Sequence, residues 1–197
     1  MPHRASLLLL LLAWIVDPCW AGSHLSSGAE APPLPAWISF CERSPAECAV
    51  QADEPDLVTL TAVTAELIAS VNRAVNHSLT AITDEQHWGV ADDWDLPRDG
   101  QGDCEDYQLL KRQMLVAAGL PRRALRMTVV LDAFGAGHAV LTVRTDQGDF
   151  ILDNLTDDVL LWSATHYLFV KRESTDRVGW VSLVPETDQI VTASAQK

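Results

Sequence analysis

A cysteine, a histidine and an aspartate in this sequence have the types and the placement needed for covalent acyl transfer. Cys104 lies in the run GDCEDY at residues 102–107, where a helical pattern begins. Unpaired backbone N–H groups and the helix dipole at such a start favour a thiolate. His138 and Asp153 lie on two strands of one expected hairpin. A nucleophile, a base and an orienting carboxylate form one catalytic unit in acyl-transfer enzymes. The simpler alternative is that Cys104 is a half-buried structural cysteine.

The register of that hairpin decides whether the histidine and the aspartate can meet. If Arg144 lies opposite Asp149, a charge pair closes the turn and one face of both strands is apolar, through Leu141, Val143, Phe150 and Leu152. A slip of one residue would break this pattern. Asp153 then lies diagonal to His138, about 7–8 Å away between backbones, within reach of a hydrogen bond. The alternative is that His138 only caps its strand and Asp153 only begins a turn.

Carboxylates crowd the cysteine. Asp103, Glu105 and Asp106 flank it, and the preceding stretch adds four more, Asp92, Asp93, Asp95 and Asp99. Negative neighbours raise the pKa of a thiol, and the helix dipole opposes them by only about 1 kcal/mol or less. Clustered carboxylates suit calcium, although the spacing is not that of an EF-hand. The alternative is a solvated acidic helix start.

Helical patterns come first in the chain and strand patterns follow. We expect a short helix-turn segment at 37–49, a long amphipathic helix from Asp56 to about His77, and a helix at 104–118. Asp103 is the expected N-cap of the last helix, with Asp106 completing a near capping box. Period-two segments then predict strands at 125–131, 138–144, 149–153, 167–171 and 178–184. This order predicts an α+β fold, with the nucleophile helix packed on an antiparallel sheet. The connection at 80–102 is long enough to suggest a functional role.

Length and composition indicate one globular domain in an exported protein. The chain has 197 residues, of which 48% are hydrophobic, and a net charge of −13, which disfavours nucleic acid as a partner. A basic start, an apolar run and Ala21 predict a secretory signal at 1–21, with an uncleaved anchor as the alternative. We expect a flexible lead-in at 22–35, one domain at 36–185 and a tail at 186–197. No later segment is apolar enough to suggest insertion into a membrane.

Export also makes disulfides possible. Cys41 and Cys48 are seven residues apart, about 10 Å along a straight helix, which is too far to bridge. Pro45 can break that helix, so a local disulfide is possible without being assured. If these two pair, Cys104 is left as an odd, reactive thiol in the mature chain.

Several of these segments resemble a known family. Residues 102–107, 137–141 (GHAVL) and 152–155 (LDNL) are similar to the bacterial transglutaminase-like cysteine proteinases, which include the LapG-like periplasmic adhesin proteases. Residues 40–48 and 88–97 also look like family segments, so the resemblance covers roughly residues 36–170. It departs at Ala139, where a larger apolar residue is expected, and at the run LPR of residues 96–98.

The resemblance implies a papain-like, transglutaminase-type core with a Cys-His-Asp triad. In it, Cys104 is the nucleophile, His138 the general base and acid, and Asp153 the orienting group. The family's calcium dependence maps onto Asp103 and Glu105, with Asp106 as a further candidate. Its substrates are large exported repeat adhesins, cut near the N-terminus at a small-residue, alanine-rich site to control biofilm attachment. Its partner is an inner-membrane cyclic-di-GMP receptor (LapD-like) that inhibits the protease.

The leading hypothesis is therefore a periplasmic, calcium-dependent cysteine endopeptidase. The backbone N–H of Cys104 would stabilise the oxyanion, with Trp94 or Gln101 as candidate second donors. One alternative is a transglutaminase or amidase that uses the same triad on protein or cell wall. Another is a non-catalytic, calcium-stabilised binding module.

Overall fold

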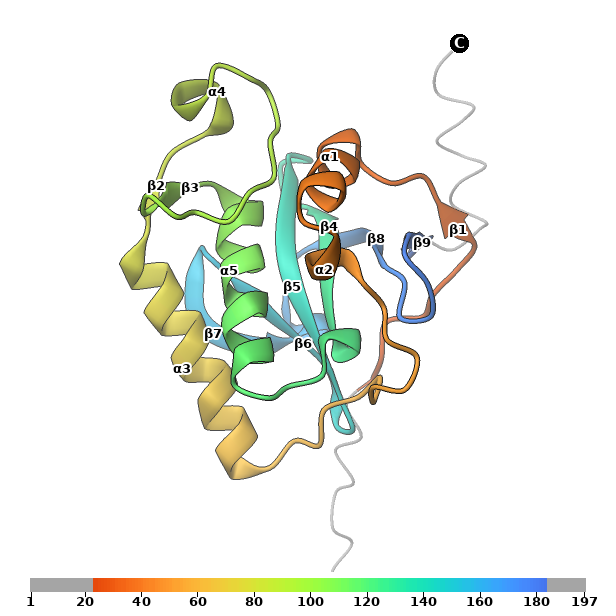
Figure 1. Ribbon diagram of the computed structural model, residues 1–197. Coiled ribbons are helices and arrows are strands. Elements are labelled where there is room, and N and C mark those ends of the chain that lie inside the picture. Colours follow the sequence, from red (N-terminus) through yellow and green to blue (C-terminus); the bar gives the residue numbers. More distant parts are fainter. Residues whose placement is uncertain (1–22, 184–197) are drawn as a thin grey trace, which may run out of the picture.

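The computed structural model describes residues 23–183, and the expected signal and tail lie outside them. A seven-stranded antiparallel sheet has the order β1-β9-β8-β4-β5-β6-β7. Its strands are β1 Glu30–Ala31, β4 Leu125–Leu131, β5 Gly137–Thr145, β6 Gly148–Asp153, β7 Thr156–Leu161, β8 Leu168–Glu173 and β9 Trp180–Ser182. With the helices on one side of this sheet, the fold is α+β, as predicted (Figure 1).

Two helices cover the face of the sheet that holds the main core. α5 (Cys104–Ala117) packs on β5, and α3 (Ala62–Ser78) packs on α5 and β7 (Figure 1). The core includes Leu109 and Leu115 of α5 and, from the strands, Met127, Leu141 and Leu152, all 0% exposed. Gly119 follows α5 with a positive φ of 95°, which is why a glycine ends this helix. The predicted helix at 104–118 is confirmed.

The long amphipathic helix begins later than predicted. α3 starts at Ala62 rather than near Asp56, because Thr61 and Thr64 form a reciprocal capping box. The Thr64 backbone N–H donates to Thr61 Oγ1 at 3.2 Å, and the Thr61 N–H donates to Thr64 Oγ1 at 2.7 Å. Val58, in the stretch predicted to be helical, instead pairs with the end of β5 next to Thr145.

The hairpin register is confirmed. Arg144 lies opposite Asp149, Val143 opposite Phe150 and Leu141 opposite Leu152. The charge pair at the turn is weaker than predicted, because Arg144 Nε and Asp149 Oδ1 are 3.9 Å apart. Asp149, which is 0% exposed, instead pairs with Arg172 at 2.9 Å.

The predicted flexible lead-in is wrong for the part that the structure describes. The Leu25 backbone N–H donates to Asp149 Oδ2 at 2.9 Å, and His24 Nδ1 lies 2.9 Å from Asp149 Oδ1. Leu25 is buried in a second apolar cluster on the sheet, with Val130, Val140, Ile151 and Phe169. Further on, β1 pairs with β9 at the sheet edge. The segment is ordered because a buried carboxylate needs its donors.

The remaining elements include several that the sequence did not predict. β7 follows β6 directly, and the connection at 80–102 contains β2 (Thr80–Ala81), α4 (Asp84–His87) and β3 (Gln101–Gly102), with β2 parallel to β3. The strands predicted at 167–171 and 178–184 are β8 and the shorter β9. The helix-turn segment is α1 (Pro35–Arg43) and α2 (Pro45–Cys48), and it holds a Cys41–Cys48 disulfide with a Cα–Cα distance of 5.6 Å. Within residues 23–183, no helix is both long and apolar enough to cross a membrane.

Candidate active site

Cys104 is the first residue of α5, as predicted, but the helix is not capped as predicted. Asp103 occupies the N-cap position without a side-chain capping bond. Its Oδ2 accepts instead from the Asp84 N–H at 3.3 Å, and Asp106 Oδ1 accepts from the Asp95 N–H at 2.9 Å. The carboxylates that were expected to cap the helix therefore accept hydrogen bonds from the backbone of residues 84–95 instead.

His138 and Asp153 meet at one end of the sheet. His138 Nε2 lies 2.9 Å from Asp153 Oδ1, and both side chains are largely buried. The carboxylate also accepts from the Leu155 N–H at 3.1 Å and from the Tyr167 hydroxyl at 2.5 Å. Burial alone would raise the pKa of Asp153, but the hydrogen bonds from His138 and Tyr167 bring it below its ordinary value. Asp153 is therefore held as a carboxylate beside the imidazole.

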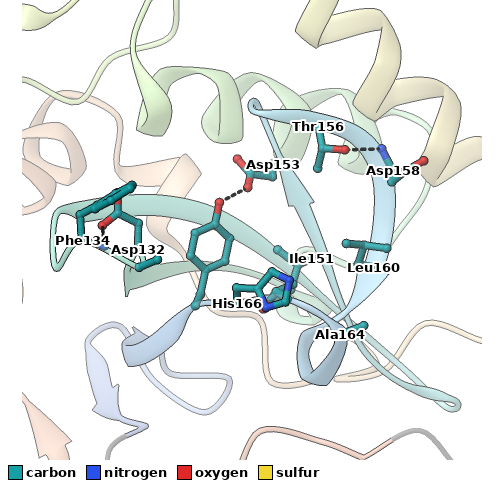
Figure 2. A pocket seen from close by; sticks show the side chains of 12 residues that line it. Asp132, Phe134, Ile151, Asp153, Thr156, Asp158, Leu160, Ala164 and His166 are labelled. Atoms are coloured by element: carbon teal, nitrogen blue, oxygen red, sulfur yellow. Dashed lines mark hydrogen bonds between the residues drawn. The ribbon is translucent and has the colours of Figure 1, made fainter.

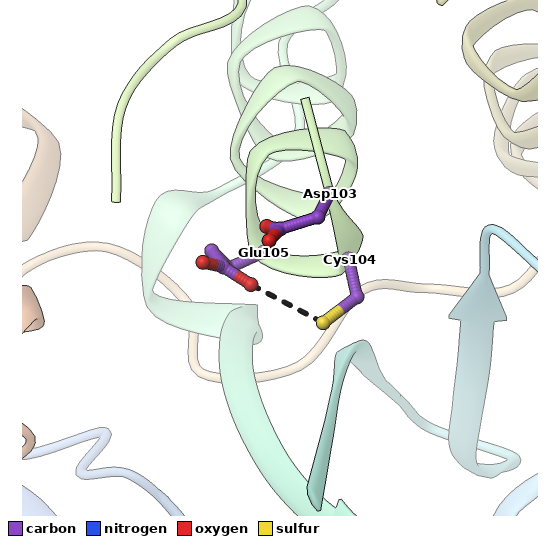
Figure 3. Close-up of side chains that lie close together, drawn as sticks. All are labelled: Asp103, Cys104 and Glu105. Atoms are coloured by element: carbon purple, nitrogen blue, oxygen red, sulfur yellow. Dashed lines mark hydrogen bonds between the residues drawn. The ribbon is translucent and has the colours of Figure 1, made fainter. Parts of the chain in front are cut away.

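The Cys104 sulfur lies next to the strand that carries the histidine. The backbone N–H of Ala139, the residue after His138, acts to lower the pKa of the Cys104 thiol and so favours its thiolate form. The opposing effects are larger. Burial raises the pKa of the thiol, and the negative charge of Glu105 raises it further. In Figure 3 the thiol faces Glu105, whose Oε2 accepts from it at 3.2 Å. Within residues 23–183, Cys104 is the free cysteine, so the predicted odd thiol is confirmed there.

The carboxylates near the cysteine form three overlapping groups, each with oxygen or sulfur atoms within 4.8 Å of one another. The groups are Asp103, Cys104 and Glu105; Asp84, Asp92 and Glu105; and Asp84, Asp103 and Asp106. Of the residues singled out from the sequence, Asp103 shares one group with Glu105 and another with Asp106. Asp84 was missed and Asp92 was not singled out, because they belong to the 80–102 connection. The sequence could have indicated Asp84 only as a first-turn residue after a capping Thr83.

Burial makes this carboxylate cluster costly when it holds no cation. Burial, and then mutual repulsion, raises the pKa of Asp84 and Asp92, of Glu105 to about 9 and of Asp106 to about 8. Asp84 Oδ1 and Asp103 Oδ1 are buried without a hydrogen-bond partner among the described residues. Unpartnered carboxylate oxygens of this kind are the ligands that calcium prefers, so the residues present fit the predicted ion.

Neither of the two side chains considered as oxyanion donors hydrogen-bonds the Cys104 sulfur within residues 23–183. Trp94 is 2% exposed, and its Nε1 donates to Asp92 Oδ1 at 3.1 Å, so the indole N–H is already used. Gln101 lines a separate cavity of about 130 Å³ with His87 and Asp106. The backbone N–H of Cys104, at the first position of α5, remains the candidate donor.

Tyr167 is a residue of the site that the sequence did not indicate. Besides its hydrogen bond to Asp153, its ring centroid lies 5.6 Å from that of His138. It borders a cavity of about 330 Å³ that also includes Asp153, beside the exposed Phe134 (Figure 2). Only the placement of β8 beside β4 brings Tyr167 here, and no local pattern predicts that neighbour.

Comparisons with known proteins bear on the family and the fold of this chain. The family model described as bacterial transglutaminase-like cysteine proteinase matches residues 26–188. Among solved structures, Legionella pneumophila LapG is 28% identical with a TM-score of 0.52, over 70% of this chain and 78% of that one. Calcium-bound Legionella pneumophila LapG is 25% identical with a TM-score of 0.52, over 70% of this chain and 83% of that one. A search of curated proteins finds no match.

Proposed function

Because this chain belongs to the bacterial transglutaminase-like cysteine proteinase family, we propose that it is a calcium-dependent cysteine endopeptidase with Cys104, His138 and Asp153 as its triad. The observation that carries the proposal is the 2.9 Å contact between His138 Nε2 and Asp153 Oδ1. His138 directly precedes Ala139, whose backbone N–H acts on the Cys104 thiol. These groups come from α5, β5 and the end of β6, and a purely structural cysteine would not require that convergence.

Each member of the triad has a defined role in the proposed reaction. Asp153 accepts from His138 Nε2, which keeps the proton on that nitrogen and leaves Nδ1 as the base. Nδ1 takes the proton of the Cys104 thiol, and the sulfur attacks the peptide carbonyl carbon. The peptide C–N bond breaks, and the imidazolium returns the proton to the leaving amine. Water, activated by the same imidazole, then hydrolyses the thioester.

The acidic cluster is the proposed calcium site, with Asp84, Asp92, Asp103, Glu105 and Asp106 as candidate ligands. A bound cation would offset the negative charge that keeps the neighbouring thiol protonated. Glu105 connects the thiol to this site, because it accepts from the thiol and belongs to two of the three groups. The calcium-bound form of Legionella pneumophila LapG supports the choice of ion.

We further propose that the protein works in the periplasm and cuts a large exported repeat adhesin near its N-terminus, at a small-residue, alanine-rich site. Release of such an adhesin would control biofilm attachment. An inner-membrane cyclic-di-GMP receptor of the LapD type is the proposed inhibitor. Family membership and the likeness to LapG support these three statements.

The test is to incubate the purified protein with exported repeat adhesins of the same genome, and to map the products by mass spectrometry. We expect one cut near the adhesin N-terminus and none with Cys104→Ala, which should keep its melting temperature. Because Cys41 and Cys48 form a disulfide, Cys104 is the cysteine among the described residues that a thiol reagent can label. Cleavage by Cys104→Ala would refute the nucleophile, and crosslinked or transamidated products would favour a transglutaminase instead.

A further inference from the structure

The hydroxyl of Tyr167 occupies the one side of Asp153 that the histidine does not. Asp153 Oδ1 accepts from His138 at 2.9 Å and from the Leu155 N–H at 3.1 Å, whereas Oδ2 accepts from the Tyr167 hydroxyl at 2.5 Å. A carboxylate bonded at both oxygens cannot rotate about its terminal bond without losing a partner. The phenol therefore fixes the orientation of the Asp153 carboxylate plane relative to His138.

The ring of the same tyrosine forms a wall. It lies 5.6 Å from the imidazole, tilted by 43°, and it also borders the cavity of about 330 Å³. Figure 2 shows the hydrogen bond to Asp153 at one side of this cavity, with Ile151 and Leu160 lining it further along. Without the ring, the buried carboxylate would face an open space on that side. Water there would compete for both of its oxygens.

We propose that Tyr167 is a positioning residue, whose hydroxyl orients Asp153 toward His138 and whose ring shields that pair from the adjoining cavity. The inference rests on the proposed triad. It adds a fourth side chain to the three of the triad. Tyr167 directly precedes β8 and lies outside the segments around Cys104, His138 and Asp153.

The chain offers a matched control, because it has two tyrosines. The Tyr107 hydroxyl donates to the Leu79 carbonyl at 3.0 Å, a structural bond between α5 and the end of α3. Tyr107→Phe and Tyr167→Phe each remove one hydrogen-bonded phenol oxygen and leave the ring in place. A purely structural role would give the two variants similar behaviour.

The measurement is the rate of alkylation of Cys104 by iodoacetamide across pH, with calcium present. Loss of the Tyr167 hydroxyl removes a hydrogen bond that lowers the pKa of Asp153, so this pKa rises. Near neutral pH the carboxylate stays ionised but loses the hydrogen bond that orients it toward the imidazole, and in acid it protonates at a higher pH than in the wild type. We expect Tyr167→Phe to slow alkylation about tenfold near neutral pH, the loss typical for a hydrogen bond to a charged group, and to move the acid limb of the profile to higher pH. Tyr107→Phe should keep the wild-type rate and limb. The other titratable groups that interact with Asp153 or Tyr167 are His138, Cys104, Asp132 and Lys111.

A second measurement does not depend on the variant folding. Protein labelled with 3-fluorotyrosine should give two ¹⁹F signals, one for each tyrosine. The Tyr167 signal should shift at the pH of the acid limb, and the Tyr107 signal should stay constant. A Tyr167 signal that does not respond, or alkylation by Tyr167→Phe within twofold of wild type with an unmoved limb, would overturn the proposal. Neither measurement uses a peptide substrate, so a lack of proteolysis would count against the proposed function and not against this inference.

Discussion

Lys111 provides a prediction about stability, because it is a cation buried without a hydrogen-bonding partner. Its side chain is 0% exposed on α5, two turns after Cys104, and Nζ makes no hydrogen bond within the described part of the chain. Burial lowers its pKa from 10.5 to about 7, and the charges of Asp153 and Asp157 only partly oppose this. We predict that Lys111→Met, which keeps nearly the same volume, makes the folded protein more stable.

The size of the effect follows from linkage. A pKa lowered from 10.5 to about 7 corresponds to roughly 5 kcal/mol at 1.36 kcal/mol for each pKa unit, which is an upper bound. Replacement of buried charges by apolar groups of similar volume typically gains about 1–4 kcal/mol, and we expect a gain in that range. The sign depends on pH. Below a pH of about 7 the folded protein carries the full cost of the buried ammonium. Between about 7 and 10.5 the folded lysine is already neutral and the unfolded one is still charged, so the cost disappears as the pH rises.

The assay is urea unfolding of wild type and Lys111→Met at a pH of about 6 and of about 9.5, with Lys171→Met as the control. Lys171 lies closer to solvent and donates to the Pro32 carbonyl at 2.8 Å, so its loss should be neutral or destabilising. Lys111→Met should be the more stable protein at the lower pH, and its advantage should shrink at the higher pH. A loss of stability, or a difference that is the same at both pH values, would refute the reasoning and show that the ammonium is well solvated or paired.

Two further predictions concern the start of α5. Calcium at about 100 times its dissociation constant should raise the free energy of unfolding by about 2.7 kcal/mol, and the melting temperature by about 5–11 °C, with reversal by EGTA. Asp84→Asn should reduce this rise, whereas Asp99→Asn, which lies outside the three groups, should not. A melting temperature that does not change with calcium would contradict the proposed calcium site. Gly102→Ala should destabilise the fold by about 1–3 kcal/mol, because the added Cβ would meet Asp106 Oδ2 at 2.5 Å. Gly137→Ala, where a Cβ has open space, is the control, and equal melting temperatures for the two would contradict the predicted clash.

The sequence predicted the parts of the site that depend on short-range patterns. The start of α5 at Cys104 follows from a local change to helical spacing, and its end follows from Gly119. The pairing of β5 with β6 follows from a turn of a few residues, so the alternation of apolar side chains was enough to fix the register. That register in turn was enough to bring His138 to Asp153.

The parts that it could not predict depend on contacts between distant segments. β7 begins with polar residues and is held by α3, where the Asn76 side chain donates to the Thr156 carbonyl at 2.9 Å. Asp84 reaches the start of α5 through the parallel pairing of β2 with β3. Tyr167 reaches Asp153 because β8 lies beside β4, out of sequence order. None of these neighbours leaves a periodic signal in its own segment.

The attachment of the first described residues to Asp149 bears on where the folding unit begins. A recombinant chain that started at residue 36, the boundary predicted from composition, would lose His24, Leu25 and the edge strand β1. It would leave Asp149 with fewer donors in the sheet interior, and it would uncover the apolar cluster around Ile151 and Phe169. A recombinant chain should therefore begin no later than Ser23 if these contacts are to be kept.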